Sequence, residues 1–306
     1  MNRNIISPDK GTKSLFGIFA AALIVALPLR AYQLIFLIDP ETGFYTKTNF
    51  TVPLLYVLLI LVGIAFIALS FFPANMPFGG TAKGGKVFAV LSFLIAVSLI
   101  VDAGIQTSEI FASLTFTDVT GYSTPQTVTA SSIFNSDTLL IFARIIFAVI
   151  SCVYFTILGF NYCGIIYDAS QFKILALGPL AWVIVRLISD FMWKINYRNI
   201  SDLLLEMFML AAFMFFFMSF ARINSNINRD TAYRKLYAFG FIGSLLALML
   251  SVPRLILIVL GQSDRIVEDF GFSLADFLIG IFIIYYLFVN IKSQNISDAS
   301  KVEEIE

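Results

Sequence analysis

Eight ionisable side chains interrupt segments of this sequence that are otherwise apolar. They are Arg30, Arg144, Arg186, Arg254, Asp102, Asp190, Glu206 and Asp276. A charge near the centre of a bilayer costs roughly 2.5–3.5 kcal/mol on insertion scales, so such residues face other helices or a wet cavity. All eight fall in the half of each segment nearer one face. We therefore expect a polar cavity, open to the outside, that binds an anionic or zwitterionic ligand.

The chain order suggests how these charges pair. The expected pairs are Asp102 with Arg144, Arg186 with Glu206 or Asp190, and Arg254 with Asp276, while Arg30 is left with Asp190, Asp39 or Glu41. Pro28, Pro179 and Pro253 lie near the arginines and are expected to open their helices toward the cavity. In an alternative interpretation, the charges are ion pairs that fix the register of the bundle, or arginines that snorkel to the interface.

Composition predicts the environment that these charges occupy. Hydrophobic residues make up 59% of the 306 residues and charged residues only 13%, against about 25% in a soluble domain. Apolar stretches long enough to cross a hydrocarbon core of about 30 Å recur along the chain. Because backbone groups must pair internally in lipid, we predict an all-α polytopic bundle. The eight expected spans are 14–38, 52–72, 87–107, 138–160, 172–193, 202–221, 236–260 and 274–291.

The distribution of Lys and Arg predicts the orientation. Twelve of the twenty basic residues fall in the alternate segments that include the N-terminus, and four fall in the opposite set. Basic residues concentrate in cytoplasmic connections. We therefore expect residues 1–13 and a disordered tail, 292–306, in the cytoplasm, and a single transmembrane domain over 14–291.

Several kinds of chemistry are excluded or disfavoured. The sequence contains no histidine, which removes Ser-His and Cys-His catalysis and HExxH metalloproteases. Its two cysteines, Cys152 and Cys163, form no CxxC motif, so we expect no metal site, and no cofactor motif is present. The zero net charge gives no basic surface for nucleic acid. The lack of these catalytic groups disfavours an enzyme, and we expect the lipid bilayer to be the main partner.

The segment after the first span carries a distinctive motif, RAYQLIFLIDPETGFY, over residues 30–45. It resembles a group of uncharacterised bacterial multi-pass membrane proteins that share an arginine, Gln-Leu and Ile-Asp-Pro-Glu-Thr-Gly-Phe. The resemblance implies a bacterial plasma membrane and brings no activity or catalytic residue with it. Asp-Pro-Glu-Thr-Gly is typical turn chemistry. The position of the carboxylates Asp39 and Glu41 in the first outer loop also resembles that in multi-pass glycosyltransferases that use lipid-linked sugars.

Three functions remain open from the sequence. The first is a transporter-like or ligand-binding membrane protein with the charged cavity described above. The second is a non-catalytic scaffold or partner subunit whose charges hold the helices together. The third is an enzyme on a lipid-linked substrate that uses Asp39 or Glu41.

Overall fold

The computed structural model of the protein describes residues 8–40, 43–47, 49–71, 85–115, 136–165, 172–193, 200–225, 227–266 and 271–303. Within these residues the fold is all-helical, and an isolated bridge between Ile38 and Tyr45 is the extent of β pairing. The helices are α1 (Pro8–Phe36), α2 (Thr51–Phe71), α3 (Lys86–Thr115), α5 (Ser136–Tyr162), η2 (Leu175–Leu177), α6 (Gly178–Trp193), α7 (Ile200–Asn224), α8 (Arg229–Val259), η3 (Ser263–Arg265) and α9 (Leu274–Glu303). The predicted all-α class is confirmed.

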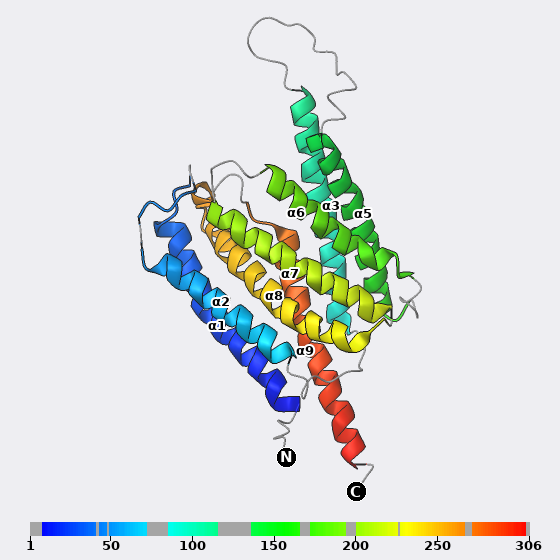
Figure 1. Ribbon diagram of the computed structural model, residues 1–306. Helices are drawn as coiled ribbons and strands as arrows, with labels where there is room; N and C mark the ends of the chain where they lie inside the picture. The colour runs from blue at the N-terminus through cyan, green and yellow to red at the C-terminus, as the bar shows by residue number, and fades with distance from the viewer. Residues whose placement is uncertain are drawn as a thin grey trace, which may run out of the picture.

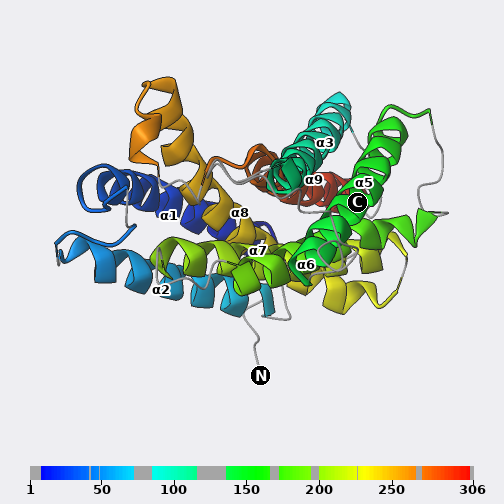
Figure 2. The ribbon, with the colours of Figure 1, turned by 90° about the horizontal axis from the view of Figure 1, so that it is seen from above.

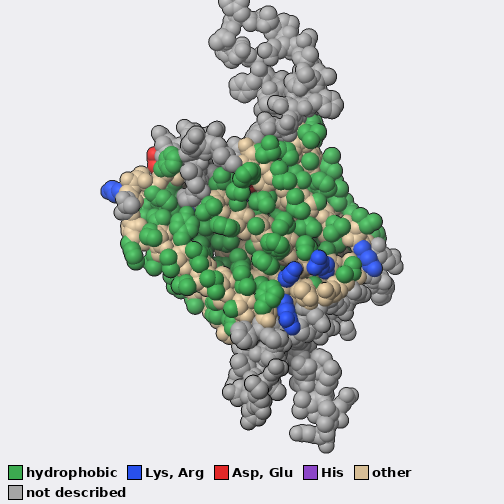
Figure 3. Space-filling model, in the orientation of Figure 1, with side chains coloured by type: hydrophobic (Ala, Val, Ile, Leu, Met, Phe, Trp, Pro, Cys, Tyr) green, Lys and Arg blue, Asp and Glu red, His purple; other side chains and the backbone are tan. Residues whose placement is uncertain are grey.

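Seven of these helices are long and apolar enough to cross a membrane, and Leu274–Asn290 of α9 forms a shorter apolar segment. Large apolar side chains such as Ile24, Ile60 and Val97 are more than half exposed on their outer faces. Figure 3 shows apolar side chains covering the middle of the visible face, while most visible Lys and Arg side chains gather toward one end. The chain is therefore an integral, multi-pass membrane protein of about eight spans.

The bundle is arranged around α7, α8 and α9. Helix α8 packs against α1, α2, α7 and α9, and α3 packs against both α5 and α9. Viewed from above, α1 and α2 lie on one side of the central helices and α3, α5 and α6 on the other (Figure 2). The start of α1 and the end of α9 lie at the same end of the bundle (Figure 1), as an even number of spans requires.

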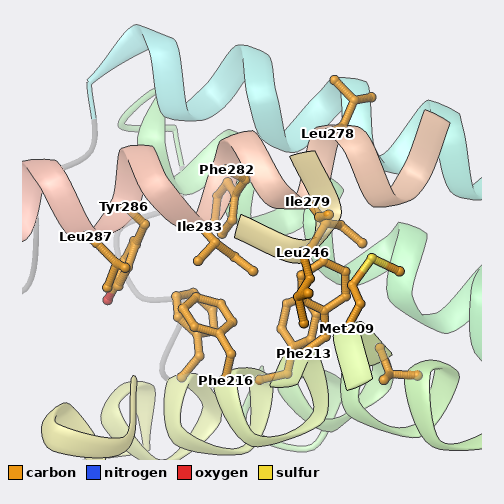
Figure 4. Close-up of a cluster of buried hydrophobic side chains, with 14 of the residues drawn as sticks. Met209, Phe213, Phe216, Leu246, Leu278, Ile279, Phe282, Ile283, Tyr286 and Leu287 are labelled. Carbon is orange, nitrogen blue, oxygen red and sulfur yellow. The ribbon is translucent and has the colours of Figure 1, made fainter. Parts of the chain in front are cut away.

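Aromatic side chains fill the core between α7 and α9. Phe213 and Phe216 on α7 face Ile279, Phe282 and Ile283 on α9 (Figure 4), and all are at most 1% exposed. Edge-to-face and stacked ring pairs continue through this cluster, with ring centroids 5.4–6.4 Å apart in the Phe216–Phe217, Phe220–Phe282 and Phe216–Tyr286 pairs. Because such geometries suit the charge distribution of aromatic rings, the cluster holds α7 and α9 in register.

Small residues let α8 and α9 approach closely. The Ser244 hydroxyl of α8 donates a 2.7 Å hydrogen bond to the Gly280 carbonyl of α9. A Cβ atom on Gly280 would lie 2.9 Å from the Cβ of Ala247. Contacts of this kind give van der Waals packing where lipid provides no hydrophobic driving force between helices.

Several boundaries differ from those predicted. Helix α8 begins at Arg229 rather than near 236 because its first turns are basic and lie beyond the apolar segment. Helix α9 continues past residue 291 to Glu303, through the segment for which the sequence predicts a disordered tail. Ala, Lys and Glu residues there favour a helix without requiring an apolar face.

The prolines do not open their helices as expected. Helices α1 and α8 continue through Pro28 and Pro253, which lie inside them. Pro179 lies in the first turn of α6, where its missing N–H costs little. Access to the arginines therefore does not come from breaks at these prolines.

The close approach of α8 and α9 predicts a stability effect. We expect Gly280→Leu to lower the free energy of unfolding by about 1–3 kcal/mol, since the new side chain must displace Ala247. Thermal unfolding in mild detergent, followed by tryptophan fluorescence, measures the change. Gly104→Leu is the matched control, because Gly104 is exposed on α3 with nothing within 4 Å of an added Cβ. Equal losses in the two variants would contradict this packing.

Candidate functional site

Two arginines from different helices share one buried carboxylate. Arg30 of α1 forms an ion pair with Asp202 of α7, and Nη2 of Arg254 on α8 lies 3.4 Å from Oδ2 of the same aspartate. The three residues are 2%, 3% and 6% exposed, in the order Arg30, Asp202, Arg254. This group, which we call the arginine–aspartate triad, carries two positive charges and one negative charge.

The loop after α1 folds back over the triad. The Asp39 amide donates to the Phe44 carbonyl at 3.0 Å and the Gly43 amide to the Asp39 carbonyl at 2.7 Å. Gly43 has a φ of 66°, the left-handed conformation that glycine adopts without strain. This turn carries Tyr45 back toward α1, where Nη1 of Arg30 donates to its hydroxyl at 3.4 Å. The motif turn therefore places a tyrosine against a buried arginine.

Further polar groups fix the two guanidinium groups. Nη1 of Arg30 lies 3.3 Å from Oε1 of Gln33, and Nε2 of Gln33 donates to the Thr51 carbonyl at 2.8 Å. Nη1 of Arg254 lies 3.3 Å from the Gly271 carbonyl in the segment before α9. The Gln33 side chain of α1, held by the Thr51 carbonyl at the start of α2, thus orients Arg30, and the Gly271 carbonyl orients Arg254.

A second group gathers around Arg186 of α6. Its Nη1 and Nη2 donate to the two carboxylate oxygens of Asp276 on α9 at 2.6 and 2.8 Å. Its Nη2 also donates to Glu206 of α7 at 2.7 Å, and its Nε lies 3.7 Å from Asp190 one turn along α6. The Trp182 ring lies 5.6 Å from the guanidinium carbon. Three carboxylates therefore contact a single guanidinium.

The two groups form one layer. Glu206, Asp276 and Arg186 all interact electrostatically with Arg254 of the triad. We call the set the charged layer; its members are Arg30, Arg186, Arg254, Asp190, Asp202, Glu206 and Asp276. All seven are between 2% and 6% exposed, so the layer is closed rather than open to the outside in this structure.

Asp102 and Arg144 lie apart from the charged layer. They pair across α3 and α5 with a nitrogen–oxygen distance of 3.3 Å, as the sequence predicts, but their side chains are 24% and 19% exposed. Gln106 donates a 2.7 Å hydrogen bond to Asp102 from one turn away on α3. This pair behaves as an ordinary inter-helix contact and provides a natural comparison for the buried arginines.

Sequence reasoning missed Asp202 and misassigned two partners. Arg30 binds Asp202 rather than Asp190 or a first-loop acid, and Arg254 binds Asp202 rather than Asp276, which binds Arg186. Asp202 falls at the predicted start of its span and was therefore not counted among the buried charges. Its spacing of four residues before Glu206 was the available signal, since residues i and i+4 share one face of a helix.

The first-loop carboxylate Asp39 lies in the turn that follows α1. The backbone of Asp39 closes the turn, and its side chain is half-buried. Glu41 lies outside the described residues, so its predicted role stays a prediction.

Comparisons with protein-family models, with curated proteins and with solved structures found no match to this chain. The chemistry of the charged layer therefore carries the functional inference.

The contrast between the buried Arg186 and the partly exposed Arg144 is testable. We expect Arg186→Leu to lower the free energy of unfolding by about 3–5 kcal/mol, because it leaves three buried carboxylates without the guanidinium that they contact. Arg144→Leu should cost less than about 1 kcal/mol, since its pair is partly exposed. Chemical or thermal unfolding of both variants in the same detergent measures the difference. Similar losses would show that burial does not set the strength of these pairs.

Proposed function

We propose that this membrane protein binds the anionic group of a small ligand between Arg30 and Arg254, and that it is transporter-like. One observation carries the proposal: two guanidinium groups, each at most 6% exposed, converge on the single carboxylate of Asp202. Guanidinium groups bind carboxylates and phosphates with directed, charge-assisted hydrogen bonds.

Asp202 occupies the position that a ligand carboxylate would take. Both arginines reach it from different helices, and one of the two contacts, at 3.4 Å, is long for a charge-assisted hydrogen bond. An incoming anion would compete with Asp202 for these donors. Within the triad two guanidinium groups share one carboxylate, so an incoming anion can accept hydrogen bonds that Asp202 alone does not.

The other side of the charged layer suits a cationic group. There, three carboxylates contact one guanidinium, and two of them also interact with Arg254. An ammonium group on the same ligand would be attracted to this side. The layer therefore supports a zwitterionic ligand as well as an anionic one.

Access to the triad runs through two outer connections. Tyr45 from the loop after α1 contacts Arg30, and the Gly271 carbonyl contacts Arg254. Arg265 in η3 also donates a 3.0 Å hydrogen bond to the Ile35 carbonyl, which ties the connection between α8 and α9 to the last turn of α1. Their movement would open the layer to the face opposite the termini. With the termini in the cytoplasm of a bacterium, this face is external, as the basic residues favour.

A scaffold function is the second candidate. Every arginine of the charged layer contacts at least one carboxylate on another helix, an arrangement that also suits ion pairs with a purely structural purpose. The two functions differ in whether an external anion can reach the triad.

Anion binding should therefore appear as a gain in thermal stability. We expect the melting temperature of the purified protein to rise with carboxylates, amino acids or phosphate monoesters at constant ionic strength, because a ligand that binds only the folded state stabilises it. Arg30→Gln and Arg254→Gln should lose most of this rise. Arg144→Gln should keep it, since that residue lies outside the charged layer.

Two outcomes oppose the proposal. One is a protein that no member of the ligand panel stabilises. The other is an equal ligand-dependent rise in wild type and Arg30→Gln, which would place the anion elsewhere. Either result would favour the scaffold.

A further inference from the structure

Helices α5, α7, α8 and α9 carry a second polar group at the end opposite the charged layer. It consists of Tyr154 on α5, Asn224 on α7, Tyr237 on α8, and Tyr286 and Asn290 on α9, and we call it the inner polar cluster. On α9, Asp276 and Asn290 are separated by fourteen residues, or about 21 Å along a helix. The apolar cluster of Figure 4 occupies the stretch between them.

Four members of the inner polar cluster are buried, Asn224 is partly buried, and the members contact one another. Nδ2 of Asn224 donates a 3.0 Å hydrogen bond to the Tyr154 hydroxyl. Tyr286 interacts with Tyr154, Tyr237 and Asn290. Asn290 and Tyr237 are 0% exposed, and Tyr154 and Tyr286 are 2% and 4% exposed. Four helices therefore bring uncharged hydrogen-bonding groups together near one end of their apolar segments.

Two of these side chains are incompletely satisfied by their neighbours. The Asn290 amide lies beside the Tyr286 hydroxyl and interacts with it, but neither Nδ2 nor Oδ1 reaches the geometry of a full hydrogen bond, and the Tyr237 hydroxyl has no partner with that geometry. Most buried polar side chains in proteins are hydrogen-bonded, and each exception requires an explanation. The Asn290 amide offers two hydrogen-bond donors and an acceptor, and it is fully buried beside the Tyr286 phenol. A ligand with both donors and acceptors matches this pair.

We propose that the inner polar cluster is a second binding site, which takes neutral hydrogen-bonding groups and opens to the side where the termini lie. Its ligand is water or the hydroxyl or amide group of a small solute, because the cluster contains no ionised side chain. The site forms the inner end of a path along α7, α8 and α9, whose outer end is the charged layer. The inference that the two sites belong to one path rests on the proposed function. The inference that the inner polar cluster is a binding site does not.

The apolar cluster between the two sites is the barrier of this path. Phe213, Phe216 and Phe282 are fully buried there. A Cβ on Gly243 of α8 would lie 2.9 Å from the Phe213 ring, so α8 seals tightly against it. A polar solute cannot share this region without separating the helices, since close-packed apolar groups leave no room for water.

Cysteine reactivity tests the inner site. In a chain with Cys152 and Cys163 replaced by serine, Asn290→Cys provides a reporter in the cluster and Ile283→Cys one in the barrier. The probe is a charged, membrane-impermeant methanethiosulfonate, added to inside-out or right-side-out vesicles. We expect Asn290→Cys to react at least tenfold faster than Ile283→Cys, and only from the inner side. Phe288→Cys controls for reaction through the lipid, because Phe288 is 51% exposed on the face of α9 that points away from the bundle.

A second reporter and a competition experiment complete the test. Tyr237→Cys replaces Asn290→Cys if that variant does not fold as judged by size-exclusion chromatography. Slower labelling in the presence of glycerol or acetamide identifies a solute site, and unchanged fast labelling identifies a water site. Labelling of the cluster reporter that is no faster than that of Ile283→Cys, from either side, overturns the proposal. The arginine variants play no part in this result, so failure of anion binding would be seen separately.

Discussion

The structure depends on the pairing of charges that have been removed from both water and lipid. Asp202 meets Arg30 and Arg254, and Arg186 meets three carboxylates, so five helices are tied together near one end of the bundle. Lipid offers no alternative partner for such groups, and separating any pair leaves an uncompensated buried charge. The relative rotation of α1, α6, α7, α8 and α9 is therefore constrained by ionic contacts at this level.

Apolar packing provides the other constraint along the same helices. Below the charged layer, aromatic rings from α7 and α9 interlock, and small residues bring α8 against α9. Below these, uncharged polar side chains return at Tyr237 and Asn290. This order, from charged to apolar to neutral polar, is what links the proposed outer and inner sites.

Much of the charged layer could be predicted from the sequence. Arginines and acids inside apolar spans stand out, because each is costly unless it faces inward. The pairing could not be predicted in full, since neighbouring segments in the chain were assumed to pair. Arg254 instead meets Asp202, because α8 packs along α7 as well as α9. Asp202 was not predicted as a buried charge because it lies at a helix boundary, where sequence patterns are least precise.

The sequence by itself determined the environment and the secondary structure. Long apolar segments must lie in lipid, and backbone groups in lipid must pair within helices. Tertiary structure alone decided which charges meet, that Tyr45 folds back onto Arg30, and that Asn290 is buried beside Tyr286. The physical reason is that hydropathy depends on the local sequence, whereas each of these contacts depends on how helices rotate and cross, which only their mutual packing fixes.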